Sequence, residues 1–263
     1  MELPTAYPRS ERSRKITFTD LFSDKAELYA EARPRYPSAL FSSLAKLAPA
    51  ATCAWDCGTG NGQAAISLAD HFETVFASDP SAQQIANAVP VRNVHYSVQA
   101  AEATAFADRT FDAVCVAQAL HWFRLDEFFA EVRRVAKPGA IFCAWGYDWL
   151  RISHDFDRAF QETVLDVVAP YWAPQNTILW RGYADVRLPF ERILLPPLHI
   201  ESHWSFHQVM AYVRTWSAVR RCEAEAGLGF LAAAEERLAP HWGPPEAERL
   251  VSMPLHTLAA RVS

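Results

Sequence analysis

The feature that most constrains the fold is a regular alternation of short apolar runs and helical stretches between residues 52 and 145. The runs are continuously apolar, as in strands covered on both faces, and the segments between them have apolar residues at helical spacing. Such an alternation builds a parallel sheet through right-handed crossovers. We predict strands at 52–57, 74–78, 94–98, 111–117 and 140–145, and helices at 64–72, 81–88 and 126–136.

A glycine-rich loop directly follows the first predicted strand. Gly58, Gly60 and Gly62 alternate with other residues, Asp56 precedes them, and Asp79 ends the second strand. Ligands of open parallel sheets bind at the carboxyl ends of the strands, and a carboxylate at the second strand can accept hydrogen bonds from a ribose diol. The spacing differs from the G-x-G-x-x-G of dinucleotide sites, and no Gly-Lys-Ser/Thr of a phosphate-binding loop follows. An acidic residue beside the loop suits a cationic group rather than a pyrophosphate.

Four segments together resemble the class I S-adenosylmethionine-dependent methyltransferases. Residues 56–62 resemble motif I of that family, and Asp79-Pro80-Ser81 resembles its acidic second motif. Ala101-Glu102 with Phe111-Asp112-Ala113-Val114 is similar to the adenine-side loop and fourth strand, and residues 135–140 are similar to the segment that leads into strand five. The resemblance implies S-adenosyl-L-methionine as the cofactor.

The resemblance also implies roles for individual residues. Gly58 and Gly60 would line the methionine and ribose portions of the cofactor, Asp79 would bind the ribose hydroxyls, and Ala101 and Glu102 would flank the adenine. Gln118 would lie beside the methyl donor at the end of strand four. The whole set of cofactor-binding residues expected on this basis is Tyr29, Arg33, Asp56, Gly58, Thr59, Gly60, Asp79, Pro80, Ala101, Glu102 and Gln118.

Three further segments are similar to the type 11 branch, which includes trans-aconitate and similar small-molecule carboxyl methyltransferases. They are residues 117–123, 29–37 and 212–217. Arg124 stands where the branch usually has an aspartate, and Ala100 replaces a common acidic residue of the adenine loop. Adenine contacts are then expected from the backbone and Glu102 alone.

His121 is the candidate catalytic residue, because it follows strand four at the edge where chemistry is expected. It either hydrogen-bonds or deprotonates the acceptor, or it orients a loop beside Trp122. Arg214, Arg220 and Arg221 either bind an acidic substrate through bidentate contacts or form a solvated helical face. The aromatic residues of the later half line a substrate pocket or form a small core of their own: Tyr147, Trp149, Tyr171, Trp172 and Trp180.

Composition restricts the partners and the compartment. The net charge is −5 and the isoelectric point is about 6.0, which argues against a nucleic-acid partner. The 5 cysteines form no C-x-x-C pair and indicate no metal site, and no apolar run is long enough for a signal peptide or a membrane span. We therefore expect a cytoplasmic monomer or homodimer with a small-molecule partner.

The predicted architecture is a Rossmann-like, doubly wound, mostly parallel seven-stranded sheet with helices on both faces and a helical insertion in the C-terminal half. We expect a helix over 154–168, a proline-marked stretch, helices over 206–216 and 221–238, and a final strand. We expect a disordered leader (1–18) followed by a single methyltransferase domain (19–263). Along the chain, this domain consists of N-terminal lid helices (19–50), a cofactor-binding core (51–150), a substrate-side insertion with helices (151–252) and a final strand (253–263).

The expected activity is methyl transfer from S-adenosylmethionine to a small molecule, with an oxygen such as a carboxylate as the acceptor. The alternatives are methylation of nitrogen or carbon in a biosynthetic pathway, or a non-catalytic S-adenosylmethionine-binding protein. A nicotinamide-dependent oxidoreductase is disfavoured by the glycine spacing.

Overall fold

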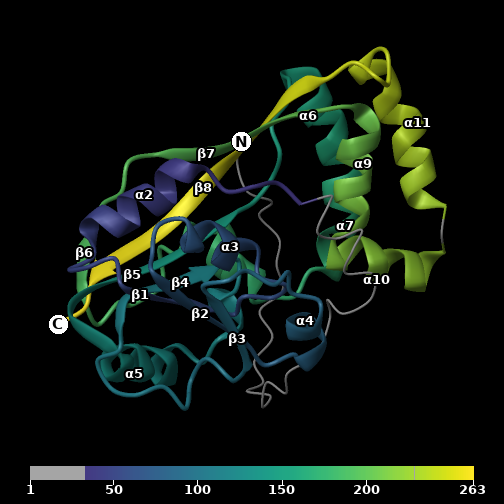
Figure 1. Cartoon of the computed structure of the whole chain (residues 1–263). Helices are drawn as coiled ribbons and strands as arrows, with labels where there is room; N and C mark the ends of the chain where they lie inside the picture. The colour runs from purple at the N-terminus through teal and green to yellow at the C-terminus, as the bar shows by residue number, and fades with distance from the viewer. Residues whose placement is uncertain (1–32, 228) are drawn as a thin grey trace.

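A computed structural model describes residues 33–227 and 229–263 as one sheet with helices on both faces (Figure 1). The strands are β1 (Cys53–Cys57), β2 (Thr74–Asp79), β3 (Val94–Val98), β4 (Phe111–Ala117), β5 (Ala136–Tyr147), β6 (Glu191–Ile193), β7 (Leu198–Trp204) and β8 (Arg249–Arg261). The α-helices are α2 (Ser38–Leu47), α3 (Gln63–Ala69), α4 (Ala82–Ala86), α5 (Leu125–Val135), α6 (His154–Phe160), α7 (Asp166–Val168), α8 (Asn176–Trp180), α9 (Phe206–Arg214), α10 (Ser217–Ala226) and α11 (Phe230–Trp242).

The strand order is β3-β2-β1-β4-β5-β8-β6, with β7 also paired to β8. Strands β1 to β5 are parallel, and β8 runs antiparallel to β5, β6 and β7. The doubly wound, mostly parallel sheet of the sequence prediction is therefore confirmed. The direction in which the strand order proceeds reverses at β1, so the loops after β1 and β4 lead away from each other. Sheets of this kind bind ligands at that place, at the carboxyl ends of the strands.

The two faces of the sheet carry two separate hydrophobic cores. Alternate residues of each strand serve one face or the other, so that Ala54 faces α2 and α3 whereas Trp55 and Cys57 face α5. Leu40, Phe41 and Leu44 of α2 belong to the first core. Trp55 packs against rings that include Phe111 and Phe128 in the second. Continuous apolar strands were the signal for this double coverage, and the structure bears that out.

Within the described residues the sheet has eight strands rather than the expected seven, because one strand position is interrupted. Both β6 and β7 pair with β8, one after the other, and residues 194–197 between them leave the ladder. Pro196 and Pro197 have no N–H to donate, and Leu194 is 89% exposed. Both strands fall within 151–252, where we predicted helices and a proline-marked stretch, so that part of the prediction was wrong.

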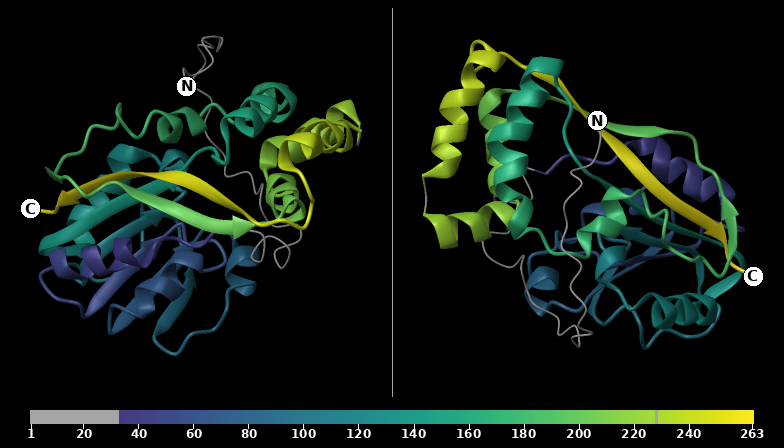
Figure 2. Two further views of the ribbon diagram at one scale, coloured as in Figure 1. Left: turned by 90° about the horizontal axis from the view of Figure 1, so that it is seen from above. Right: turned by 180° about the vertical axis from the view of Figure 1, so that it is seen from behind.

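The helices of the later half gather beyond the carboxyl ends of the parallel strands. Figures 1 and 2 show α6, α7, α9, α10 and α11 as one group at that end of the sheet. Trp242 of α11 packs against Phe156 of α6 and Phe206 of α9, and these rings form a core within the group. This group therefore stands next to the edge that carries the glycine loop.

Three predicted elements differ in detail. The helix expected over 221–238 is two helices, because α10 ends at Ala226, where Gly227 (φ 93°) follows as its cap, and α11 begins at Phe230. The helix over 154–168 is continuous but contains a π-helical turn at Gln161–Leu165. The strand expected from Ala140 begins at Ala136, since Phe111 of β4 pairs with Ala136 before a register shift.

Lys137 anchors this early start of β5. Its Nζ lies 2.8 Å from Asp112 Oδ1, and the Asp112 side chain is 1% exposed. Burial opposes the charge of Asp112, but hydrogen bonds from Lys137, Thr52 and the Cys53 backbone outweigh it and hold the pKa of the carboxyl below its usual value. The pair joins the beginning of β5 to β4 and β1.

Candidate active site

The glycine loop makes a tight turn between β1 and α3. Gly58, Gly60 and Gly62 have φ angles of 71°, 57° and 92°, which favour glycine. The N–H groups of Gly58 and Thr59 donate to the Ser78 carbonyl at 2.8 and 3.0 Å, so the loop is tied to the end of β2. The turn therefore holds its shape through backbone contacts to the neighbouring strand.

Gly58 and Gly60 differ in what surrounds them. A Cβ on Gly58 would lie 2.7 Å from the Ala119 Cβ and 3.0 Å from the Phe123 ring, because the segment after β4 packs closely there. Among the residues that the structure describes, a Cβ on Gly60 would meet only Gln84 Oε1, at 3.9 Å. Gly58 is thus needed for packing, whereas Gly60 leaves open space on the outer side of the loop.

Asp79 lies against the same loop from the end of β2. Its Oδ2 accepts the Gly60 N–H and its Oδ1 accepts the Ser81 N–H, each at 2.9 Å. Ser81 in turn begins α4, where its side chain accepts the Gln84 N–H. Pro80 between them is exposed. Two predicted residues, Gly60 and Asp79, are therefore in direct contact.

Asp56 is the buried carboxyl of the site. It is 0% exposed, and its Oδ2 accepts a hydrogen bond of 2.5 Å from Thr59 Oγ1. Oδ1 is buried and has no hydrogen-bond partner among the described residues. Burial raises the pKa of Asp56 to about 7, against the hydrogen bonds from Thr59 and the Ala65 backbone, and the charge of Asp79 adds to the rise. A cationic group next to Oδ1 would favour the ionised form.

Glu102 contacts the segment that follows β4. Its Oε1 accepts the Arg124 N–H at 2.9 Å and lies 3.8 Å from Arg124 Nη1. Arg124 also pairs with Glu127 at 2.6 Å. Ala101 beside it is buried, with 6% exposure. Arg124, where the branch usually has an aspartate, thus joins the predicted adenine loop to α5.

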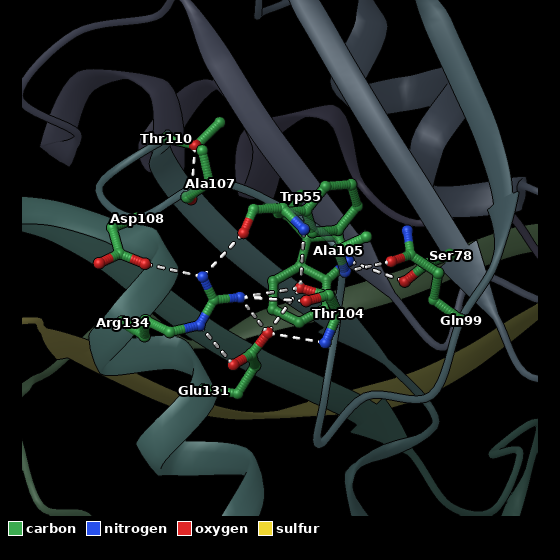
Figure 3. A network of polar contacts seen from close by, with 11 residues as sticks. Trp55, Ser78, Gln99, Thr104, Ala105, Ala107, Asp108, Thr110, Glu131 and Arg134 are labelled. Carbon is green, nitrogen blue, oxygen red and sulfur yellow. Dashed lines mark hydrogen bonds and ion pairs between the residues drawn. The ribbon is translucent and has the colours of Figure 1, made fainter.

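A polar network that the sequence did not reveal holds the rest of this loop (Figure 3). Glu131 Oε1 on α5 accepts the Thr104 N–H at 2.8 Å and the Thr104 hydroxyl at 2.6 Å. Arg134 donates to the Phe106 carbonyl at 2.7 Å and pairs with Glu131 and Asp108. These partners lie far apart in the sequence, and no motif links them. The loop that carries Ala101 and Glu102 is therefore held by two side chains of one helix.

This network gives a first prediction. We expect Glu131→Gln to lower the free energy of unfolding by about 2 kcal/mol, because the Arg134 guanidinium loses a buried charge partner. We also expect it to weaken S-adenosylhomocysteine binding severalfold through the loosened loop. Chemical denaturation and calorimetry measure the two effects. Asp108→Asn is the matched control: Asp108 is 73% exposed, so its loss should change either quantity little.

Gln118 directly follows β4 and has an unusual conformation, with φ at 54°. Its Nε2 donates to the Tyr147 carbonyl at 3.2 Å, and its Oε1 is buried without a hydrogen-bond partner among the described residues. A Cβ on Gly146 would lie 2.5 Å from that oxygen and 2.9 Å from the Tyr183 hydroxyl. Gly146 of β5 therefore makes the room in which the Gln118 side chain lies.

Arg33 reaches the same end of β5. Its Nη1 donates to the Tyr147 hydroxyl at 3.1 Å, and its guanidinium lies 5.9 Å from the Tyr212 ring centroid. Tyr147, absent from the predicted cofactor set, thus contacts both Arg33 and Gln118. Tyr29, the leader (1–18) and the first part of the lid segment (19–32) lie outside the described residues.

His121 lies in a 3₁₀ turn (Leu120–Trp122) directly after β4. It is 6% exposed, and its ring centroid is 4.9 Å from that of Trp122. Burial lowers its pKa to about 4, so the imidazole is neutral near pH 7. Nδ1 is buried without a hydrogen-bond partner among the described residues. The neutral ring can donate or accept a hydrogen bond, but its lowered pKa makes it a weak base.

Two of the three arginines of the late cluster have partners among the described residues. Arg214, which is 52% exposed, pairs with Glu235 of α11, and Arg221 donates to the Tyr171 carbonyl at 3.0 Å. These contacts favour the solvated helical face over binding of an acidic substrate.

The part of the chain that the structure describes contains neither a metal-binding cluster nor a membrane-spanning helix. No group of three or more His, Cys, Asp and Glu side chains is placed to hold a metal ion there. No helix in the same ranges is both long and apolar enough to cross a bilayer.

Known proteins resemble this chain in sequence and in fold. A family model described as a methyltransferase domain, of type 11, matches residues 55–144. A Dictyostelium discoideum protein described as a methyltransferase is 30% identical over 207 residues, 76% of this chain and 78% of that protein. A Saccharomyces cerevisiae protein described as an S-adenosylmethionine-dependent methyltransferase is 24% identical over 128 residues, 45% of this chain and 44% of that protein.

A solved structure extends the similarity to nearly the whole chain. A protein of Anaeromyxobacter dehalogenans, described as a type II methyltransferase, superposes with a TM-score of 0.83 at 40% identity, over 88% of this chain and 98% of that one. The matched residues 55–144 contain the glycine loop, Asp79 and the segment after β4. This similarity sets the oxidoreductase alternative aside. The chain belongs to the class I S-adenosylmethionine-dependent methyltransferases, enzymes whose cofactor is S-adenosylmethionine.

Proposed function

We propose that this chain binds S-adenosylmethionine along the glycine loop and methylates a carboxylate oxygen of a small molecule. The observation that carries the proposal is the pair of carboxyl groups on either side of the loop. Asp79 lies against Gly60, and Asp56 is buried beneath Thr59. A diol at Asp79 and an ammonium group at Asp56 would match these two carboxylates, and among the described residues a Cβ on Gly60 would meet only Gln84 Oε1, at 3.9 Å.

The chain's own residues would then bind and orient the two reactants. Glu102, held by Arg124, would border the adenine, and Gln118 would face the methyl-bearing end from β4. When bound, the cofactor supplies a methyl group on a sulfonium, and its transfer to a carboxylate forms an O–C bond as the C–S bond breaks and leaves the electron pair on sulfur. Such a displacement requires positioning and exclusion of water more than proton transfer.

His121 supports a carboxylate as the acceptor. An imidazole with a pKa of about 4 is a poor base for a hydroxyl, whereas a carboxylate is already ionised and needs none. The neutral ring still carries one N–H, which can donate to a carboxylate oxygen. We therefore assign His121 to orienting the acceptor, next to the end of β4.

A His121 variant tests this role. We expect His121→Ala to lower kcat about 10- to 100-fold and to leave S-adenosylhomocysteine affinity within about twofold, as for a group that acts only on the acceptor. His121→Gln, which keeps an N–H donor, should recover part of the activity. Loss of cofactor binding or of folding in His121→Ala, with no rescue by glutamine, would instead assign the residue to the structure of the loop.

A further inference from the structure

Four indole rings form one cluster at the carboxyl end of β5. We call Trp149, Trp172, Trp180 and Trp216 the tryptophan cluster. The Trp149 ring lies 5.7, 5.3 and 5.7 Å from those of Trp172, Trp180 and Trp216, measured between centroids. Trp172 also contacts the other two, at 5.6 and 5.7 Å. The four residues come from separate segments of the chain, between or at the ends of regular elements.

The cluster lies on the acceptor side of the proposed cofactor site. Trp149 is two residues beyond Tyr147, whose carbonyl accepts the Gln118 amide. In the sheet, β2 with Asp79 lies on one side of β1, and β4 and β5 lie on the other. A cofactor whose ribose is at Asp79 and whose ammonium is at Asp56 therefore extends toward β4. The next position beyond it belongs to the segment after β5.

Partial exposure distinguishes the cluster from a sealed core. Trp149, Trp172 and Trp180 remain partly exposed, whereas the large rings of the two sheet cores, such as Trp55 and Trp145, are 0% exposed. The Trp172 Nε1–H, like that of Trp145, is buried and has no acceptor among the described residues. Buried donors in proteins normally have a partner, and at the partly exposed Trp172 a ligand oxygen can be that partner.

We propose that the tryptophan cluster binds the methyl acceptor and that this acceptor is an aromatic carboxylic acid. Indole rings offer edge and face contacts to a flat ring, and the Trp172 N–H donates to an oxygen of the same molecule. The inference rests on the proposed function for the position of the cofactor, and it adds the ring to the chemistry of the acceptor. Under this proposal, Trp149, Trp172 and Trp180 line a substrate pocket rather than form an isolated core.

The test uses the full-length chain saturated with S-adenosylhomocysteine, so that no turnover occurs. Binding of benzoate and of cyclohexanecarboxylate is measured by calorimetry and by tryptophan fluorescence. The two acids have the same charge and similar size and differ in the flat ring. We expect benzoate to bind about tenfold more tightly, since each aromatic contact adds to the affinity beyond burial of area. Trans-aconitate, an aliphatic acid, should bind no better than cyclohexanecarboxylate.

Variants locate the effect. Trp172→Phe should weaken benzoate about fivefold through the lost N–H donor, at unchanged S-adenosylhomocysteine affinity. Trp204→Phe is the control, because Trp204 packs on Tyr212 outside the cluster, at 5.5 Å. Equal affinity for the two probes, no binding of either at millimolar concentration, or equal effects of the two variants would overturn the proposal. Failure to bind S-adenosylhomocysteine itself would instead contradict the proposed cofactor site.

Discussion

Gly60→Val is expected to reduce S-adenosylmethionine affinity by more than about 100-fold, equivalent to about 2.7 kcal/mol. A valine side chain would occupy the open side of the loop, where a Cβ meets only Gln84 Oε1 at 3.9 Å. Within residues 33–227 and 229–263 no other atom lies within 4 Å of that Cβ, so we expect the loss to come from exclusion of the ligand. Calorimetric titration of the variant measures it.

Gly139→Val is the matched control for the backbone. Gly139 has φ at 80°, comparable to the 57° of Gly60, and a Cβ on it would meet no described residue within 4 Å. Both variants should lose about 1–2 kcal/mol of stability, because a side chain is strained at positive φ. Only the Gly60 variant should lose the cofactor. If both folded variants bound S-adenosylmethionine with equal affinity, the glycine loop would not be part of the binding site.

Asp56→Asn is expected to have the second-largest effect, a loss of about 50-fold in S-adenosylmethionine affinity at pH 8. The variant leaves a cationic ligand group without the buried charge that it would pair with, and breaking such a pair is costly. Asparagine preserves the shape of the side chain and the contact with Thr59. An unchanged affinity at pH 8 would show that Asp56 does not contact the cofactor's cationic end.

The pH dependence provides a separate readout of Asp56. With a pKa of about 7 in the ligand-free protein, the carboxyl is mostly protonated at pH 6, and a cationic ligand must displace that proton. Wild-type affinity should therefore rise about fivefold from pH 6 to pH 7 and about tenfold from pH 6 to pH 8, and level off above pH 8, whereas Asp56→Asn should show no such rise.

The same raised pKa has the opposite effect on stability. A carboxyl whose folded pKa lies above its unfolded value of about 4 stabilises the fold below pH 4, and that contribution is lost as the pH rises through 7. Ligand-free Asp56→Asn should therefore unfold at a higher temperature than wild type at pH 8. A thermal scan at pH 5 and pH 8 checks the sign.

The sheet core could be predicted because its strands are uniformly apolar and its turns are marked by glycine and proline. The predicted bounds of the strands at 94–98 and 111–117 coincide with β3 and β4. The strands at the other edge carry no such signal. Glu191 and Arg192 of β6 are exposed, and Pro196 and Pro197 interrupt the position, so the segment resembles a loop in sequence.

The helix prediction over 221–238 failed for a related reason. Gly227 and Gly229 were treated as residues within a helix, whereas a glycine at positive φ commonly ends one. Helical periodicity on both sides of Gly227 concealed the break.

The candidate site likewise has one part that the sequence predicts and another that it does not. Asp56, Gly58 and Gly60 lie within a few residues of one another in a recognisable motif, and the structure brings Asp79 to the same loop. Glu131 and Arg134 hold the adenine-side loop from a helix about 30 residues further along the chain, and only tertiary packing brings them there. The role of Tyr147 likewise depends on how β5 meets Arg33 and Gln118.

One titration tests the central claim most directly: the purified chain against S-adenosylmethionine, S-adenosylhomocysteine and a nicotinamide dinucleotide, with Gly60→Val and Gly139→Val alongside. The account predicts micromolar binding of the first two ligands and none of the third, with binding lost only in Gly60→Val. Binding of the dinucleotide alone, or full affinity in a folded Gly60→Val variant, would contradict it.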